Sequence, residues 1–182
     1  MRLLPPLRLL VALLATGALL AAPAQAGAKA RAACTGTDVA PSAENLDAVR
    51  ATILCLHNRE RVARGLAPLR ENPRLRRAAD GHSVEMVVTR QFEHGDFAGR
   101  ILRTRYGRGQ AWAMGENIAW GTGILATAGE IQRAWMASPP HRANILRRQF
   151  REIGIGIALG APVPDTGGLP GATYTADFGA RR

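Results

Sequence analysis

The side chains best suited to chemistry in this sequence are its four histidines and two polar neighbours in a glycine-rich segment. They are His57, His82, His94, Glu116, Asn117 and His141. Imidazole and carboxylate groups bind divalent metals and transfer protons near neutral pH. The sequence has no His-Glu-x-x-His metal motif, no Gly-x-Ser-x-Gly turn and no phosphate-binding loop. Any reaction would therefore depend on histidine and carboxylate groups.

Three of these residues lie between regular elements, where functional groups concentrate. His94 lies in FEHGD, His141 follows Pro139-Pro140, and Glu116 lies in the glycine-rich segment 107–123, which we interpret as irregular. If His94, Glu116 and His141 converge, they form a pocket that can hold a divalent metal or polarise a water molecule.

The other two histidines fall within helical patterns. His82 lies on an apolar stripe and is predicted to be a core histidine with one hydrogen-bond partner. His57 is followed by Asn58, Arg59 and Glu60, so we place it on a helix surface or just behind the site.

The N-terminal 26 residues are typical of a secretory signal peptide. Arg2 and Arg8 precede the apolar run 9–20, and Ala24-Gln25-Ala26 resembles a cleavage site. The apolar run is too short to cross a bilayer, which disfavours a membrane anchor. We therefore expect an exported protein without a transmembrane segment in its mature chain, comprising a tail at 27–42 and one domain at 43–182.

Export determines how the two cysteines are interpreted. Disulfides persist outside the cytosol, and Cys34 and Cys55 are the only cysteines. We predict that they pair and join the tail to the first helix. Lipidation of Cys34 is the alternative, which its distance from the apolar run disfavours.

The chain is strongly basic. Its formal charge is +10, and removal of Arg2 and Arg8 leaves 22 basic against 14 acidic side chains, a net charge of +8. Such a protein outside the cell meets anionic wall polymers and lipid head groups. The sequence contains no nucleic-acid-binding motif, so nucleic acid is not an expected partner. The arginines are spread along the chain, which favours a solvated surface.

The order of predicted elements indicates an α+β fold. Apolar periodicity predicts helices from a Ser42 cap to Gly65, from an Asn72 cap to Thr89, over 96–106, and from a Thr127 capping box through Trp135. Strands are predicted over 153–159 and 172–178, joined by a long loop. Gly154, Gly156 and Ala158 form a nearly bare strand face that lets another layer approach closely.

Five motifs in order carry a family resemblance. They are CLHNRERVARGLAPLRENPRLRRAADGHSVEM, FEHGD, MGENIAWG, IQRAWMASPPHRANIL and FREIGIGIAL. Over residues 46–179 the chain resembles the bacterial branch of the CAP superfamily, or SCP domains, which includes cysteine-rich secretory, antigen 5 and pathogenesis-related 1 proteins. The resemblance implies an α-β-α sandwich with a small central antiparallel sheet. It also implies a cleft with two histidines and two acidic residues that holds zinc or another divalent ion.

The resemblance assigns three of the four cleft positions. His94 and His141 take the histidine places, as metal ligands, and Glu116 takes one acidic place, followed by Asn117. The fourth place holds Ser138, where animal and plant members have a glutamate. Loss of that carboxylate weakens the case for acid/base catalysis and for metal binding.

Two functions follow from different classes, and whether the protein is an enzyme stays open. The first is a secreted, monomeric binding module for a divalent metal, lipid, peptide or cell-wall ligand. The second is a secreted hydrolase, peptidase-like or acting on the cell wall, in which Glu116 is the candidate catalytic residue. A third possibility is that these polar residues only hold the cleft together by hydrogen bonds.

Overall fold

The computed structural model describes residues 33–109 and 111–181. The predicted signal peptide at 1–26 and the first part of the predicted tail lie outside the described residues. Within the described ranges, no helix combines the length and the hydropathy needed to cross a bilayer.

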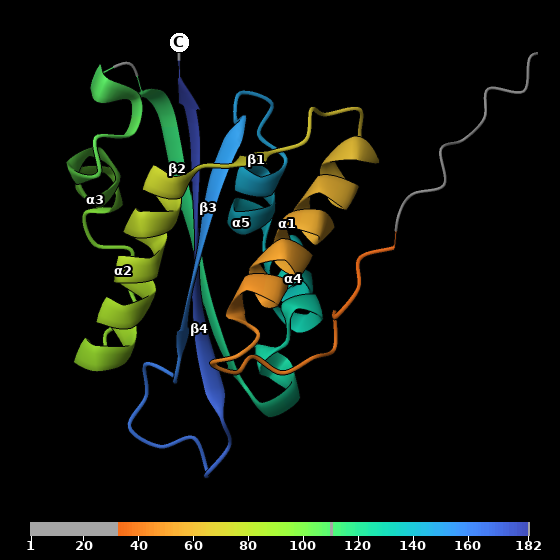
Figure 1. Cartoon of the computed structure of the whole chain (residues 1–182), viewed down its shortest axis with the longest axis vertical. Coiled ribbons are helices and arrows are strands. Elements are labelled where there is room, and N and C mark those ends of the chain that lie inside the picture. Colours follow the sequence, from red (N-terminus) through yellow and green to blue (C-terminus); the bar gives the residue numbers. More distant parts are fainter. Residues whose placement is uncertain (1–32, 110, 182) are drawn as a thin grey trace, which may run out of the picture. The chain divides into compact units, whose positions relative to one another are not determined.

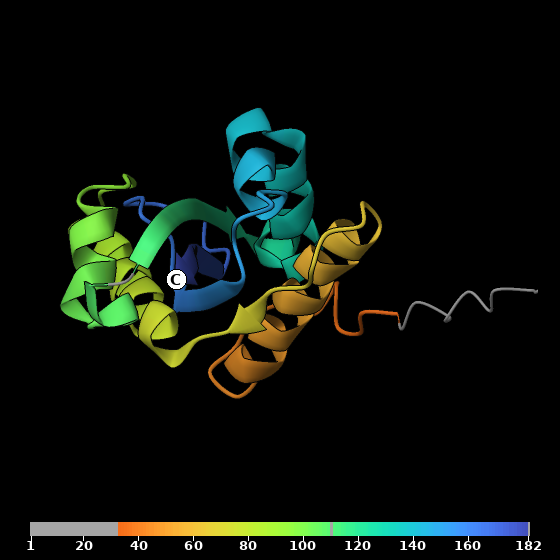
Figure 2. The same ribbon diagram turned by 90° about the horizontal axis from the view of Figure 1, so that it is seen from above.

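A four-stranded sheet lies between two layers of helices. The strands are β1 (Arg70–Glu71), β2 (Ala111–Thr122), β3 (Glu152–Leu159) and β4 (Gly171–Arg181). The helices are α1 (Leu46–Val62), α2 (Pro73–Thr89), α3 (Phe97–Arg103), α4 (Ala128–Ala137) and α5 (Pro139–Ile145), with 3-10 turns η1 (Tyr106–Gly109) and η2 (Gly123–Ala126). Helices α2 and α3 cover one side of the sheet, and α1, α4 and α5 cover the other (Figures 1 and 2).

The strand order is β1-β3-β4-β2. β4 pairs antiparallel with both β2 and β3, whereas the two-residue β1 pairs parallel with β3. The predicted α+β sandwich and the β3–β4 hairpin are therefore confirmed, and the sheet is antiparallel apart from the short β1 pairing.

Helix α2 contacts the sheet at the predicted bare face of β3. A Cβ atom added at Gly154 would overlap the backbone of Arg76, and one added at Gly156 would overlap the backbone of Ala79. The two glycines thus let the helix axis approach closer than any other residue would allow. This contact fixes where α2 begins and ends relative to the sheet.

Helix starts were predicted with mixed success. Asn72 caps α2 as expected, because its Oδ1 accepts a hydrogen bond from the Arg74 N–H at 2.9 Å. Ser42 does not cap α1, which begins after Asn45, and the Ser42 hydroxyl donates to Glu44 instead. Thr127 precedes α4 but forms no side-chain cap bond.

The prediction that segment 107–123 is irregular was wrong from residue 111 onward. Residues 111–122 form β2, which pairs with almost the whole of β4. Glycines made this segment look like a loop, yet Gly115 serves close packing. A Cβ atom there would lie 2.9 Å from the Phe150 ring. Glu116 and Asn117 therefore lie on a strand.

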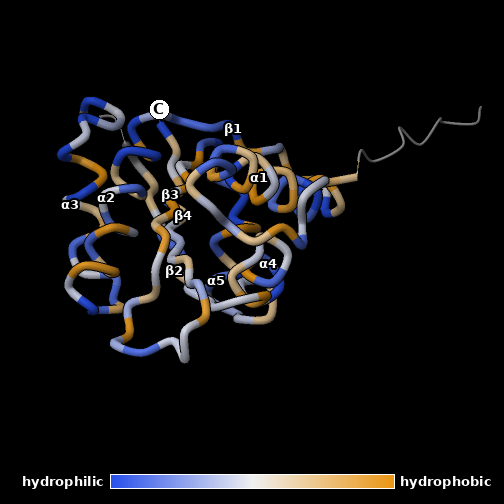
Figure 3. The backbone as a smooth tube through the Cα atoms, turned by 60° about the horizontal axis from the view of Figure 1, so that its bottom comes forward, coloured by the Kyte–Doolittle hydropathy of each residue, from blue (hydrophilic) through white to orange (hydrophobic). Residues whose placement is uncertain are grey.

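The main core fills the space between the sheet and the α1, α4 and α5 layer. Phe150 and Phe178 stack with ring centroids 5.4 Å apart, and the Trp135 indole donates to the Ile118 carbonyl at 3.1 Å. Figure 3 shows hydrophobic stretches along the strands and along the helices, with hydrophilic residues between them. The buried apolar area of these aromatic residues is the main source of stability.

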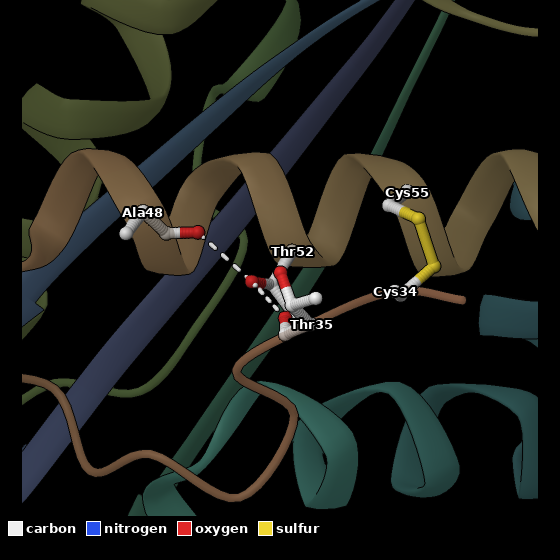
Figure 4. The surroundings of a disulfide bond; sticks show 5 residues. All are labelled: Cys34, Thr35, Ala48, Thr52 and Cys55. Atoms are coloured by element: carbon white, nitrogen blue, oxygen red, sulfur yellow. Dashed lines mark hydrogen bonds between the residues drawn. A yellow bond between two sulfur atoms is a disulfide. The ribbon is translucent and has the colours of Figure 1, made fainter. Parts of the chain in front are cut away.

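The N-terminal segment is attached to α1 by the predicted disulfide. Cys34 and Cys55 are bonded, with Cα atoms 5.8 Å apart (Figure 4). The Thr52 hydroxyl also donates to the Thr35 carbonyl at 2.9 Å. Farther along, the Gly129 N–H of α4 donates to the Thr37 carbonyl at 2.8 Å. The described part of the tail thus bridges α1 and α4.

Removal of the disulfide should destabilise the domain without changing its fold. The bond closes a loop across 21 positions, so the paired variant Cys34→Ala/Cys55→Ala should lose about 3 kcal/mol of unfolding free energy. Urea unfolding followed by circular dichroism measures this loss. An unchanged denaturation midpoint would show that the hydrogen bonds from Thr52 and Gly129 suffice to hold the segment.

Candidate functional site

Glu116 is the centre of the candidate site. It lies in the middle of β2, and only 1% of its side chain is exposed. Its Oε1 accepts a hydrogen bond from His94 Nδ1 at 2.7 Å, and its Oε2 accepts one from Arg100 Nη2 at 2.6 Å. Both carboxylate oxygens are therefore held by donors, one of which is a permanent cation.

The loop between α2 and α3 supplies His94, and α3 supplies Arg100. The Asp96 side chain caps α3 by accepting from the Gly99 N–H, which sets the position of Arg100 one residue later. Arg100 Nη2 also donates to the His94 carbonyl at 2.9 Å. One guanidinium thus joins the loop to the strand, while the His94 side chain remains 48% exposed.

His141 lies on α5, within electrostatic reach of His94. Burial lowers its pKa below the usual value, and the charge of His94 lowers it further. The α5 backbone is tied to β2, since Asn117 Nδ2 donates to the His141 carbonyl at 2.9 Å. Asn144 Nδ2 in turn donates to Asn117 Oδ1 at 2.9 Å. Asn117 therefore positions His141 through backbone contacts.

The structure thus places His94 in contact with Glu116, and it joins His141 to the same strand through the bond from Asn117 to its backbone carbonyl. Ser138, the fourth predicted cleft position, takes no part in this network. It separates α4 from α5, and in the described part of the chain its hydroxyl forms no hydrogen bond. No acidic side chain replaces it on α4 or α5 near this junction, because Glu130 pairs with Arg133 at the other end of α4.

The sequence analysis missed an acidic residue, Asp177. It lies directly opposite Glu116 in the β2–β4 pairing and is completely buried. Neither of its oxygens has a hydrogen-bond partner among the described residues. Burial raises the pKa of Asp177 well above its usual value, the negative charge of Glu116 raises it further, and the charge of Arg100 opposes them. The sequence did contain a signal for Asp177, because an acidic residue lies inside the strand predicted over 172–178.

The remaining histidines differ in how well they were predicted. His82 is buried as predicted, but it has two hydrogen-bond partners instead of one: Nε2 donates to the Glu93 carbonyl at 2.9 Å, and Nδ1 lies 3.2 Å from Glu85 Oε2. Its Nε2 also lies 4.0 Å from Glu116 Oε1. The surface placement of His57 was wrong. It is fully buried 5.5 Å from the Trp135 ring and 5.9 Å from the Phe178 ring, and burial lowers its pKa to about 4.

A cavity of about 280 Å³ adjoins this network at His82 and Arg100. His94, Glu116 and His141 do not line it, although both sequence neighbours of His94 do. Its lining mixes acidic, basic and neutral polar side chains: His82, Glu85, Met86, Thr89, Gln91, Glu93, Gly95, Asp96, Arg100 and Arg103. In residues 33–109 and 111–181, no three His, Cys, Asp or Glu side chains are arranged to hold a metal ion. A zinc site with three protein ligands does not fit, because the Glu116 carboxylate that accepts from His94 is paired with Arg100.

Asp177 should make stability depend on pH in a characteristic direction. A raised native pKa means that Asp177 keeps a proton in the folded state that it has lost in the unfolded state. The unfolding free energy of the wild type therefore declines as pH rises above about 4. Relative to wild type, Asp177→Asn should therefore gain unfolding free energy with rising pH, by up to about 1.4 kcal/mol per pH unit. Urea unfolding at pH 4.5 to 8 measures the difference.

Asp165→Asn, in the exposed loop between β3 and β4, is the matched control and should follow the wild-type profile. Parallel profiles for wild type and Asp177→Asn would contradict a proton held at Asp177.

Comparisons with known proteins agree with this geometry. Residues 54–166 match the model of the cysteine-rich secretory protein (CAP) family. The chain is 33% identical over 139 residues to the uncharacterized protein YkwD of Bacillus subtilis, covering 75% of this chain and 53% of that one. It therefore spans about half the length of this curated relative.

Solved structures show the same fold. An extracellular SCP-domain protein of Bacillus anthracis is 26% identical with a TM-score of 0.57, covering 75% of this chain and 44% of that one. An outer surface protein of Borrelia burgdorferi, 18% identical with a TM-score of 0.56, covers 78% and 96% respectively and is similar in fold alone. The motifs, the sandwich and these matches agree, and the chain belongs to the CAP family of cysteine-rich secretory proteins, in its bacterial SCP-domain form.

Proposed function

We propose that this protein is an exported binding module whose cleft, at His94, Glu116 and His141, takes a polar, peptide-bearing ligand of the cell envelope. The observation that carries the proposal is the state of Glu116. Both of its oxygens accept hydrogen bonds inside a buried pocket, from His94 and Arg100. Two partly exposed imidazoles are left as the groups that a ligand can reach.

The same observation disfavours hydrolysis. A general base must direct a lone pair at the proton it removes, and it works best when its charge is not neutralised by a fixed cation. The Glu116 carboxylate is paired with Arg100 at 2.6 Å and its side chain is only 1% exposed. The described residues also offer no free thiol, since both cysteines are in the disulfide.

The chemistry of the cavity favours a peptide or peptidoglycan fragment over a lipid. In the cavity that adjoins the cleft, carboxylates of Glu85, Glu93 and Asp96 can accept from ligand amines, and Arg103 can donate to ligand carboxylates and carbonyls. A lipid chain would be better accommodated by a separate, more apolar hollow of about 290 Å³ at Met136, Ala137, Pro139, Arg142, Ala143 and Leu146.

Export is part of the proposal. A disulfide persists in an oxidising compartment, and the Cys34–Cys55 bond follows a segment with the features of a signal peptide. The related Bacillus anthracis protein is described as extracellular. We infer that this chain acts outside the cytoplasm, where cell-wall peptides occur.

Binding of a wall fragment should depend on His94. A disaccharide-tetrapeptide muropeptide should bind wild type by calorimetry and bind His94→Gln about tenfold more weakly, because a hydrogen bond to the ligand is lost. Glutamine can still donate to Glu116, so the fold should survive. Arg133→Gln on the outer face of α4 is the control and should bind like wild type.

Palmitate provides a second arm of the experiment. Suppose that wild type binds palmitate but not the muropeptide, and that Leu146→Ala no longer binds palmitate. The ligand site would then be the apolar hollow and not the polar cleft. If wild type cleaves the muropeptide and Glu116→Gln does not, the protein is a hydrolase and the binding-module proposal is wrong.

We also propose that any divalent metal binds this cleft only through the imidazoles of His94 and His141, and hence weakly. Zinc titration should give a Kd above about 1 μM, or less than about 8 kcal/mol, against about 10–16 kcal/mol for four-ligand structural sites. His94→Ala/His141→Ala should abolish the binding, and Ser138→Ala should leave it unchanged. A nanomolar Kd would show that Glu116 leaves Arg100 to become a ligand.

A further inference from the structure

A second cavity, larger than the cleft, lies at the end of the sheet where β4 ends. Its volume is about 850 Å³. β1, the start of α2, η1 and the beginning of β3 all meet here, at the end marked C in Figure 1. The larger cavity shares no lining residue with the cavity beside the cleft, and His94, Glu116 and His141 do not line it. The charged residues lining it, which we call the arginine basin, are Arg70, Arg74, Arg108, Arg151, Arg181 and Glu152.

The single carboxylate in the arginine basin serves a structural role. Glu152 accepts hydrogen bonds from Tyr106 Oη at 2.7 Å, Asn72 Nδ2 at 2.9 Å and Arg181 Nε at 2.8 Å. Burial alone would raise the pKa of Glu152, but the bonds from Arg181 and the other two donors lower it below the usual value. Glu152 is thus ionised, and it neutralises Arg181.

The other four guanidinium groups are left without a compensating negative charge. Among the described residues, Arg70, Arg74 and Arg108 form no ion pair, and Arg151 donates only to the backbone carbonyls of Arg148 and Phe150. Four like charges around one hollow repel each other, and this repulsion is relieved when an anion binds.

A buried cation, Arg61, adds to the positive potential of the arginine basin. Arg61 is completely buried and donates to the backbone carbonyls of Ala67, Ile145, Arg147 and Phe150. Burial, together with the charge of Arg151, lowers its pKa to about 10. Arg61 nevertheless remains protonated at neutral pH. Among the described residues Arg61 bonds only backbone carbonyls, so no carboxylate neutralises its charge.

We propose that the arginine basin binds a linear anion that carries several phosphate groups. Guanidinium groups match phosphate oxygens in a planar, two-bond geometry, which favours phosphate over other anions. The cavity is several times larger than one phosphate, and its arginines come from four separate segments, so adjacent phosphates of one chain can be bound together. A concave site recessed between these segments fits a polymer strand better than a flat bilayer surface.

The binding does not depend on the proposed function of the cleft. His94→Gln, which should weaken muropeptide binding, should leave phosphate binding at the arginine basin unchanged, so the two proposals can fail separately.

Sodium tripolyphosphate titrated into the protein by calorimetry at low salt tests the proposal. Arg70→Gln/Arg74→Gln should bind about tenfold more weakly or worse, because charge-assisted hydrogen bonds are lost. Arg59→Gln/Arg133→Gln removes the same charge from exposed helix positions and should bind like wild type. Arg70→Lys/Arg74→Lys keeps the charge but not the planar fork, and should give an intermediate affinity. Citrate, a trivalent anion without phosphate, should bind more weakly than tripolyphosphate.

Three results would overturn the proposal. If Arg70→Gln/Arg74→Gln and Arg59→Gln/Arg133→Gln weaken tripolyphosphate binding equally, the binding depends on net charge and not on the arginine basin. Wild-type affinity in Arg70→Gln/Arg74→Gln would place the anion elsewhere. Sedimentation with phosphatidylglycerol vesicles but not phosphatidylcholine vesicles, without tripolyphosphate binding, would make the arginine basin a membrane contact.

Discussion

Helix α2 lies directly on the glycine face of β3, and the rest of the structure depends on this close contact. Gly154 and Gly156 allow a backbone-to-helix approach that any side chain would prevent. The contact places α2 across both β3 and β4, with its last turn against the end of β3 at Gly160, and the loop that follows reaches β2 through His94. His82 and His94 reach Glu116 for this reason. A sheet face without side chains is thus a precondition for the cleft.

Burial of two carboxyl groups on neighbouring strands is the most demanding feature of the site. Glu116 and Asp177 lie opposite each other in the β2–β4 pairing, and both side chains are screened from water. Arg100 and His94 stabilise the charge on Glu116, whereas a proton on Asp177 avoids a second charge. Removal of one partner from such a network leaves an uncompensated buried charge.

The cleft and the arginine basin differ in whether their arginines are paired with carboxylates. In the cleft, Arg100 is paired with Glu116, and the adjoining cavity is also lined by Glu85, Glu93 and Asp96. In the arginine basin, one ionised carboxylate faces five guanidinium groups and is itself bound by Tyr106, Asn72 and Arg181. The excess positive charge of this chain is thus partly concentrated at one end of the sheet, although the arginines are scattered in the sequence and suggested only a solvated surface.

The sequence by itself determined the helices with strong apolar periodicity, the Asn72 cap, the β3–β4 hairpin, the disulfide and the family. These depend on local spacing, turn residues and ordered motifs, which can be read along the chain. Only the tertiary structure decided that residues 111–122 form a strand, that His57 is buried and that Asp177 faces Glu116. Each of these depends on which segment packs opposite: β4 pairs with β2, Phe178 covers His57, and Phe150 needs the space at Gly115. Such contacts join residues far apart in sequence, so no local pattern contains them.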